Sequence, residues 1–119
     1  MITTREQFEA AAAAGSLAGE TIERISLDGF EALSLDLSRT VFRGVSARGA
    51  NLGSALLLGA RLEGCDFTGV DLRSSVCIDL DASSASGAAP SVLHGARFDD
   101  SVLSGARLDG AIVTGSKLE

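Results

Sequence analysis

Side chains that could do chemistry are few in this chain. His94 is the only histidine, and the chain has no tyrosine or tryptophan. General acid–base and nucleophilic sites depend on such groups held beside a second reactive side chain. We find no catalytic constellation of this kind. The sequence therefore predicts that the protein is not an enzyme, and His94 is expected to be exposed to solvent.

Two further sets of residues have the chemistry of metal ligands. Four acids bracket an irregular stretch of the chain: Asp79, Asp81, Asp99 and Asp100. They could bind a cation, but they lack the spacing of a calcium loop, and solvated acids are the favoured interpretation. Cys65 and Cys77 have no evident partners for a disulfide or a metal site, so we expect two small buried hydrophobes. No metal and no cofactor is predicted.

The element that must position these side chains is a repeat of five residues, which is clearest over residues 50–72. A small residue begins each unit, Leu or Phe follows two positions later, and Gly often ends the unit. A helix would need an apolar period near 3.6 and a strand a period of 2, so a sustained period of five indicates a repeat architecture. Residues two apart on an extended chain point the same way. The small residue (the shoulder) and the large residue (the centre) are therefore expected to face inward.

This pattern resembles that of the pentapeptide-repeat family, whose motif is A-(D/N)-L-x-x. Residues 25–79 and 91–119 supply 17 units, and 13 of their centres are Leu or Phe. The resemblance implies an all-β solenoid, a right-handed quadrilateral parallel β-helix of about four to five coils that are stacked about 4.8 Å apart. The chain departs from the motif at three large shoulders, Ile25, Phe30 and Leu35.

The N-terminal residues 1–22 are predicted to form a short capping α-helix, and residues 23–119 the repeat domain. Residues 3–14 have the pattern of a helix, with Gly15 as a natural end. A capping box is available in two registers, Thr3 with Glu6 or Thr4 with Gln7. The first coil of a solenoid exposes an apolar end. We expect Phe8 to cover it and the large shoulders to accommodate the helix; a partner-binding helix is the alternative.

An irregular segment near residues 80–90 interrupts the repeat. It is rich in Ser, Ala and Gly and ends at Pro90, which is typical of a loop. A second interpretation continues the coil through Ala82 and Gly87 with one inserted residue. Both interpretations predict a local bulge or a protruding loop, followed by a return to the correct order of faces.

The C-terminal units extend to the last residue of the sequence, with no capping segment after them. Four apolar residues are expected to line this end: Leu103, Leu108, Val113 and Leu118. Gyrase-protecting members of the family dimerise through their C-terminal ends, so the resemblance implies a possible homodimer. The alternative is a monomer whose edge is protected by Lys117 and Glu119.

Outward residues twenty positions apart are expected to lie one above the other. Arg43 would then stack under Glu63, and Asp28 under Arg48, as solvated pairs. One group differs because it is apolar, and we call it the apolar face: Leu56, Leu58, Val76 and Ile78. It is a candidate protein-interaction surface; an ordinary hydrophobic ladder is the alternative.

Charge and composition limit the class of function. The net charge is −6, which disfavours nucleic-acid binding. No run of 18 apolar residues and no signal peptide is evident, so no membrane contact and a cytoplasmic location are expected. The Ala, Arg and Gly bias hints at a bacterial source.

The favoured function is a non-enzymatic scaffold or interaction module with an unknown protein partner. Its N-terminal helix loosely resembles that of accessory proteins of bacterial secretion clusters. The alternative, taken from other family members, is an acidic DNA mimic that binds DNA gyrase or topoisomerase. From residue 25 onward, however, 12 acids and 8 bases are interspersed and form no single acidic stripe.

Overall fold

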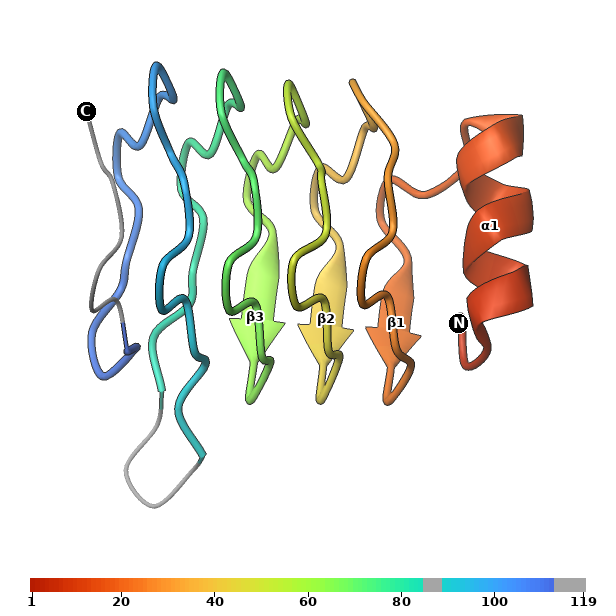
Figure 1. Ribbon diagram of the computed structural model, residues 1–119, viewed down its shortest axis with the longest axis horizontal. Coiled ribbons are helices and arrows are strands. Elements are labelled where there is room, and N and C mark those ends of the chain that lie inside the picture. The colour runs from red at the N-terminus through yellow and green to blue at the C-terminus, as the bar shows by residue number, and fades with distance from the viewer. Residues whose placement is uncertain (85–88, 113–119) are drawn as a thin grey trace.

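The structure is a computed structural model that describes residues 1–84 and 89–112. Helix α1 (Arg5–Ala14) is followed by three short strands, β1 (Thr21–Glu23), β2 (Val41–Arg43) and β3 (Arg61–Glu63). The strands form a parallel sheet in the order β1-β2-β3. Each strand pairs with residues twenty positions further along the chain, for example Thr21 with Val41. Figure 1 shows the chain winding as a solenoid that begins at α1.

Three further ladders of isolated parallel bridges follow the same offset of twenty residues. One joins Ser26, Ser46 and Asp66, the next joins Glu31, Asn51 and Asp71, and the third joins Asp36, Leu56 and Val76. Together with the sheet they form four ladders along the molecule, one for each five-residue unit. Outside the sheet, each five-residue unit supplies one bridge to its ladder, because the chain turns before a longer strand can form.

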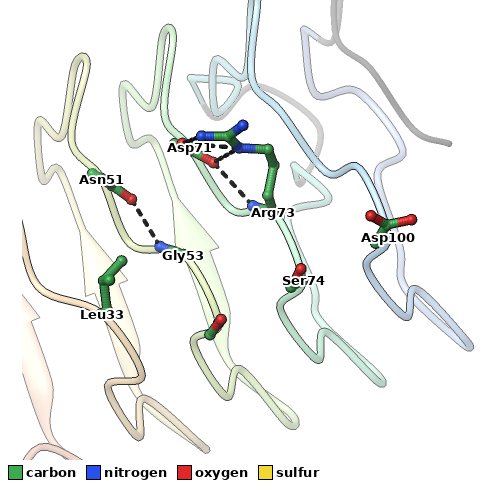
Figure 2. Close-up of a pocket in the computed structure, with 8 residues that line it drawn as sticks. Leu33, Asn51, Gly53, Asp71, Arg73, Ser74 and Asp100 are labelled. Carbon is green, nitrogen blue, oxygen red and sulfur yellow. Dashed lines mark hydrogen bonds and ion pairs between the residues drawn. The ribbon is translucent and has the colours of Figure 1, made fainter.

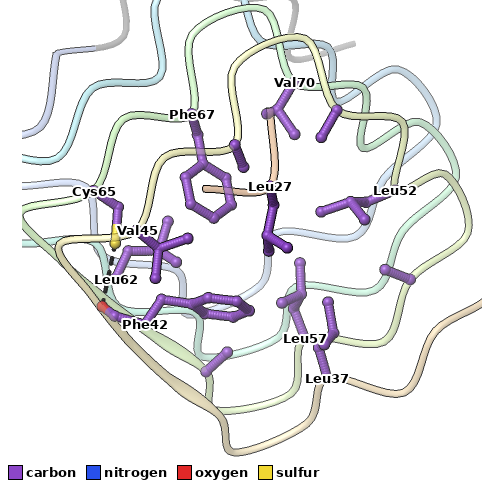
Figure 3. Packing of buried hydrophobic residues seen from close by; sticks show 14 of the residues in the cluster. Leu27, Leu37, Phe42, Val45, Leu52, Leu57, Leu62, Cys65, Phe67 and Val70 are labelled. Atoms are coloured by element: carbon purple, nitrogen blue, oxygen red, sulfur yellow. Dashed lines mark hydrogen bonds between the residues drawn. The ribbon is translucent and has the colours of Figure 1, made fainter. Parts of the chain in front are cut away.

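The core contains the shoulders and the centres, as the five-residue pattern predicts. Centres such as Leu52 and Leu62 are buried, and the shoulders Ala55 and Ala60 have no exposed surface. Figure 3 shows Leu52, Leu62 and other core side chains converging on the interior from several coils. The rings of Phe42 and Phe67 meet edge to face at 5.8 Å between centroids, an arrangement favoured by their quadrupoles.

Polar shoulders in the core have hydrogen-bond partners in the backbone. The hydroxyl of Thr40 donates to the carbonyl of Leu37 at 2.7 Å, and that of Ser75 donates to the carbonyl of Leu72 at 2.6 Å. Each acceptor is the centre three residues earlier. Ser and Thr therefore replace Ala at a shoulder without leaving a buried hydroxyl unpaired.

Helix α1 begins two residues later than predicted and uses the second capping register. The hydroxyl of Thr4 accepts a hydrogen bond from the backbone N–H of Gln7, and Gly15 ends the helix in the left-handed conformation. The side chain of Phe8 is fully buried, and its ring meets that of Phe30 edge to face at 5.3 Å. The large shoulder at Phe30 thus contacts the helix.

The irregular segment adds residues between two ladders without disturbing their order. Arg61 pairs with Asp81, but Asp66 pairs with Val92 and Val76 with Val102, so the offset rises from 20 to 26 residues. The centre Ala82 is buried as predicted. Continuation with a single inserted residue is wrong, because it would have paired Val92 with Asp71. Gly87 lies outside the described residues.

Candidate functional site

The apolar face occupies outward positions on one side of two successive coils. Leu56 and Val76 pair directly in a parallel bridge. Leu56, Leu58 and Ile78 expose 39%, 36% and 37% of their surfaces, whereas Val76 is half-buried. These residues flank the buried centres Leu57 and Cys77, since side chains alternate along an extended segment. The four predicted residues therefore lie together on the surface.

A fifth apolar residue, Val102, extends this face into the next coil. It pairs with Val76 and exposes 42% of its surface. The sequence prediction missed Val102 because it assumed an offset of twenty residues at this ladder. The signal was available in the similar sequences S-V-C-I and S-V-L-S, at residues 75–78 and 101–104.

Backbone groups of the apolar face form hydrogen bonds between neighbouring coils. The N–H of Leu56 donates to Leu35, that of Leu57 to Val76, and that of Cys77 to Val102, at 2.7–2.9 Å. A partner therefore meets side chains here instead of an open strand edge.

Two acids stand at the corners that border this face. Asp79 directly follows Ile78, and Asp100 comes two residues before Val102; both are exposed and have left-handed backbone conformations. Among the described residues, no cation forms an ion pair with either carboxylate.

The four acids considered as a cation site do not converge on one point. Asp81 accepts hydrogen bonds from the backbone N–H and the hydroxyl of Ser83, and Asp99 bonds the guanidinium of Arg97 at 2.9 Å. Within residues 1–84 and 89–112, no group of three or more His, Cys, Asp or Glu side chains is arranged to hold a metal ion.

A groove of about 410 Å³ lies beside the corner at Asp100, on the side of the solenoid next to the apolar face. Gly53 leaves a gap between Leu33, which is 67% exposed, and Arg73 of the next coil. Figure 2 shows Arg73 turned back onto Asp71, which it contacts through Nε and through a second nitrogen at 2.7 Å. This guanidinium lowers the pKa of Asp71. In the groove, Arg73 is thus paired with Asp71, and Asn51 with the backbone N–H of Gly53, whereas Asp100 at its edge has no ion pair among the described residues.

Sequence reasoning missed this groove. Its signal is the glycine at the outward position after the centre Leu52, where the units at the same position of the neighbouring coils carry Leu33 and Arg73. The sequence could reveal the missing side chain, but not the turn of Arg73 away from the gap.

The thiols and the histidine do not form a reactive site. Cys65 and Cys77 are buried and free, as predicted. Burial raises the pKa of the Cys65 thiol to about 11 and also raises the pKa of Cys77. Both thiols therefore stay protonated near neutral pH, and a protonated thiol is a poor nucleophile. His94 is exposed on another side of the solenoid.

One of the two predicted surface pairs is present as expected. Arg43 Nε lies 2.6 Å from a carboxylate oxygen of Glu63. The other pair stacks as predicted but forms no direct ion pair: Asp28 accepts a hydrogen bond from the backbone N–H of Arg48, while the guanidinium of Arg48 lies 3.7 Å from Asp66. The hydroxyl of Ser46 also donates to Asp28, so this carboxylate is satisfied by uncharged groups of the next coil.

The predicted C-terminal surface is described only in part. Leu103 and Leu108 are half-buried against the core. Val113 and Leu118 lie outside the described residues. In the described part of the chain, no helix has the length and apolar character needed to cross a bilayer.

Comparison with known proteins identifies the architecture. Residues 36–73 and 91–119 match a family model described as Pentapeptide repeats, with eight copies. HetL, a pentapeptide repeat protein involved in heterocyst differentiation regulation in the cyanobacterium Nostoc sp. strain PCC 7120, is similar over 82% of this chain and 45% of its own, at 21% identity and a TM-score of 0.71.

Two other solved structures are similar. Trypsin-treated QnrB1, a plasmid-mediated fluoroquinolone resistance protein, has a TM-score of 0.65 and 21% identity over 87% of this chain and 65% of its own. A thylakoid-lumen pentapeptide repeat protein from Arabidopsis thaliana has a TM-score of 0.50 and 20% identity over the same shares, 87% and 65%. The chain thus spans less than two thirds of each of these structures. The likeness implies a right-handed β-helix solenoid. No curated protein matches the chain.

Proposed function

Because the chain belongs to the pentapeptide-repeat family, we propose that it is a non-enzymatic interaction module that binds a protein partner on its apolar face. The observation that carries this proposal is the continuous apolar ladder of Leu56, Val76 and Val102, exposed at Leu56 and Val102, with the exposed Leu58 and Ile78 beside it. Contiguous apolar surface on a rigid scaffold is typical of a protein-binding site. An accessory role in a bacterial secretion cluster is one setting for such a module, and it stays a prediction.

The test is affinity capture from a bacterial lysate with the wild-type protein and a Leu58→Asp, Ile78→Asp variant. We expect a specific partner that the variant loses, because two carboxylates on the apolar face oppose its burial. Ile112→Asp is the matched control, since Ile112 is 42% exposed on another side. Circular dichroism must show that all variants remain folded. Retention of the same partner by the double variant contradicts the proposal.

A second candidate function is an acidic DNA mimic that binds gyrase, and the net charge of −6 favours it. Two contacts between successive coils weaken this candidate, because Arg43 and Arg48 place positive charge beside Glu63 and Asp66. A gyrase supercoiling assay decides the matter: inhibition of gyrase, or its protection from a quinolone, supports the mimic, and no effect removes it.

Finer features of the fold belong to the same proposal. We infer that the four ladders are the sides of a quadrilateral coil, about four to five coils high, and that α1 caps the first coil. The burial of Phe8 and the bridge between Ile2 and Ile22 support the cap. We also expect a cytoplasmic protein and a homodimer through the surface that contains Leu103 and Leu108.

A further inference from the structure

We propose that the partner presents an amphipathic α-helix whose apolar stripe carries Lys or Arg on both sides, and that this helix lies along the apolar face. The inference rests on the proposed function of that face. It adds the secondary structure and the charge of the segment that binds there.

The hydrogen bonding of the face argues against an extended segment. The N–H groups of Leu56, Val76 and Val102 donate to the preceding coil, at Leu35, Ala55 and Ser75, and the carbonyls of Val76 and Val102 accept from the centres of that coil. An added strand would gain its affinity from main-chain hydrogen bonds. The outward N–H groups of Leu58 and Ile78 are the remaining backbone donors of the face, one on each coil. They form no continuous strand edge, so a partner must bind mainly through side chains.

The shape of the face suits a helix that is parallel to the solenoid axis. One column contains Leu56, Val76 and Val102, and a parallel column contains Leu58 and Ile78. Successive coils add about 4.8 Å along the axis, so the columns form a narrow strip along it. The apolar stripe of an amphipathic helix is about 100° wide and is also continuous along the helix axis. The two strips can therefore pair along their length.

The charges at the borders of the strip indicate which side chains should flank the apolar stripe of that helix. Asp79 lies on one side of the strip and Asp100 on the other, and both carboxylates are exposed. Hydrogen bonds from Ser38 lower the pKa of the Asp36 carboxyl, and the charge of Arg39, at the corner of an earlier coil, lowers it further. The strip beside Val76 and Val102 is thus bordered by negative charge on both sides. Basic side chains that flank an apolar stripe would meet these two acids.

The same charges argue against a second copy of the chain on this face. Two apolar faces placed together would bring the corners with Asp79 and Asp100 against the corners of the other copy. Arg39 is the only cation at the corresponding corners of the described coils. Like charges that meet across an interface lower the affinity.

The experiment uses designed peptides as probes. One peptide of about 18 residues carries Leu along one helical face and Lys on both flanks, and its control carries Glu in place of Lys. Binding to the full chain is measured by fluorescence anisotropy at low salt. We expect the Lys-flanked peptide to bind and the Glu-flanked peptide to bind much more weakly. Leu58→Asp should abolish binding.

Charge-matched variants separate a local effect from the net charge. The double variant Asp79→Asn, Asp100→Asn should lower the affinity for the Lys-flanked peptide about fivefold, which is the effect expected from the loss of two exposed ion pairs. Glu6→Gln with Glu31→Gln removes the same charge from exposed positions elsewhere and should change the affinity by less than about twofold.

The outcomes distinguish the two proposals. The proposal of a basic amphipathic helix is wrong if both double variants weaken binding equally. It is also wrong if both peptides bind equally, or if the Lys-flanked peptide does not bind. If Leu58→Asp still abolishes capture of the lysate partner, the proposed function of the apolar face survives. If Leu58→Asp affects neither the peptide nor the partner, both proposals are wrong.

Discussion

At the scale of single residues, Asp and Asn have a defined role just before a centre. In five units the side-chain oxygen accepts a hydrogen bond from the backbone N–H two residues later, at 3.0–3.1 Å: Asp36, Asn51, Asp66, Asp71 and Asp81. The bond satisfies an outward N–H next to the corner. Arginine, which takes the same position at Arg61, Arg97 and Arg107, has no acceptor and cannot make it.

Replacing Asp71 tests this role through its pH dependence. Arg73 holds the pKa of Asp71 below its ordinary value of 3.8. Because the folded pKa is the lower one, the carboxylate stabilises the fold fully above about pH 4, and this contribution is lost as the pH falls through the folded pKa. Asp71→Asn should keep the backbone bond, as Asn51 does, and should lower the stability at neutral pH but not at low pH. Urea unfolding at both pH values measures the difference.

The control for this experiment is Asp109→Asn, because the Asp109 side chain is 80% exposed. We expect it to change the free energy of unfolding by less than about 0.5 kcal/mol at either pH. An Asp71→Asn variant that is equally destabilised at neutral and at low pH would show that the carboxylate charge is unimportant.

The buried thiols give a second prediction at this scale. Cys65 and Cys77 are enclosed and protonated near neutral pH, so a disulfide reagent should not modify the native protein at about pH 8. Both thiols should react after unfolding in guanidinium. A Ser104→Cys variant, with an exposed thiol, is the positive control. Rapid modification of two thiols in the native wild-type protein would contradict the described packing.

At the scale of elements, helix α1 meets the first coil through one large aromatic contact. Phe8 is buried against Phe30, and the guanidinium of Arg5 lies over the Phe30 ring at 5.6 Å. The helix has few other buried residues, because its alanines are small and only partly covered. Within α1, the apolar contact with the solenoid therefore depends largely on one aromatic side chain.

Phe8→Ala should destabilise the protein by about 3–5 kcal/mol, because it removes a fully buried ring from an interface that cannot readily close. Urea unfolding measures the loss, and amide exchange should show the largest increase in α1 and near Ile22. Leu33→Ala is the control, with an expected change below about 0.5 kcal/mol, since Leu33 is 67% exposed. If both variants unfold at the same urea concentration as wild type, α1 is not held by Phe8.

At the scale of the whole molecule, the ladders continue across the irregular segment. Val92 pairs back to Asp66 and forward to Ile112, so the coils before and after the insertion belong to one stack. The entropic cost of closing a loop rises only slowly with the number of inserted residues, so the contacts between coils can outweigh the cost of this insertion. The stack is therefore a continuous scaffold that holds the apolar face and the groove in fixed relation.

Self-association is the prediction at this scale. Leu103 and Leu108 are only partly covered, and burial between two molecules would remove more of their surface from water. Sedimentation equilibrium should show a mass that rises toward twice 12.1 kDa with concentration. Leu58→Asp should leave this association intact, because Leu58 is on the side of the solenoid. A constant mass of 12.1 kDa would contradict the dimer.

The sequence by itself determined the repeat and which side chains are buried. Each unit places its own shoulder and centre inward through a spacing of two residues, as at Ala60 and Leu62, and this depends only on the local chain. The exposed positions of Leu56, Leu58 and Ile78 followed from the same alternation. Local geometry was sufficient in each case.

Only the tertiary structure decided which units stack after the insertion and where flexible side chains turn. It placed Val102 beside Val76, left a groove at Gly53, and directed Arg48 to Asp66 in place of Asp28. The register across an insertion depends on the pairing of coils that are distant in sequence. The direction of a long charged side chain depends on which partner its neighbours leave available, and a five-residue pattern contains neither fact.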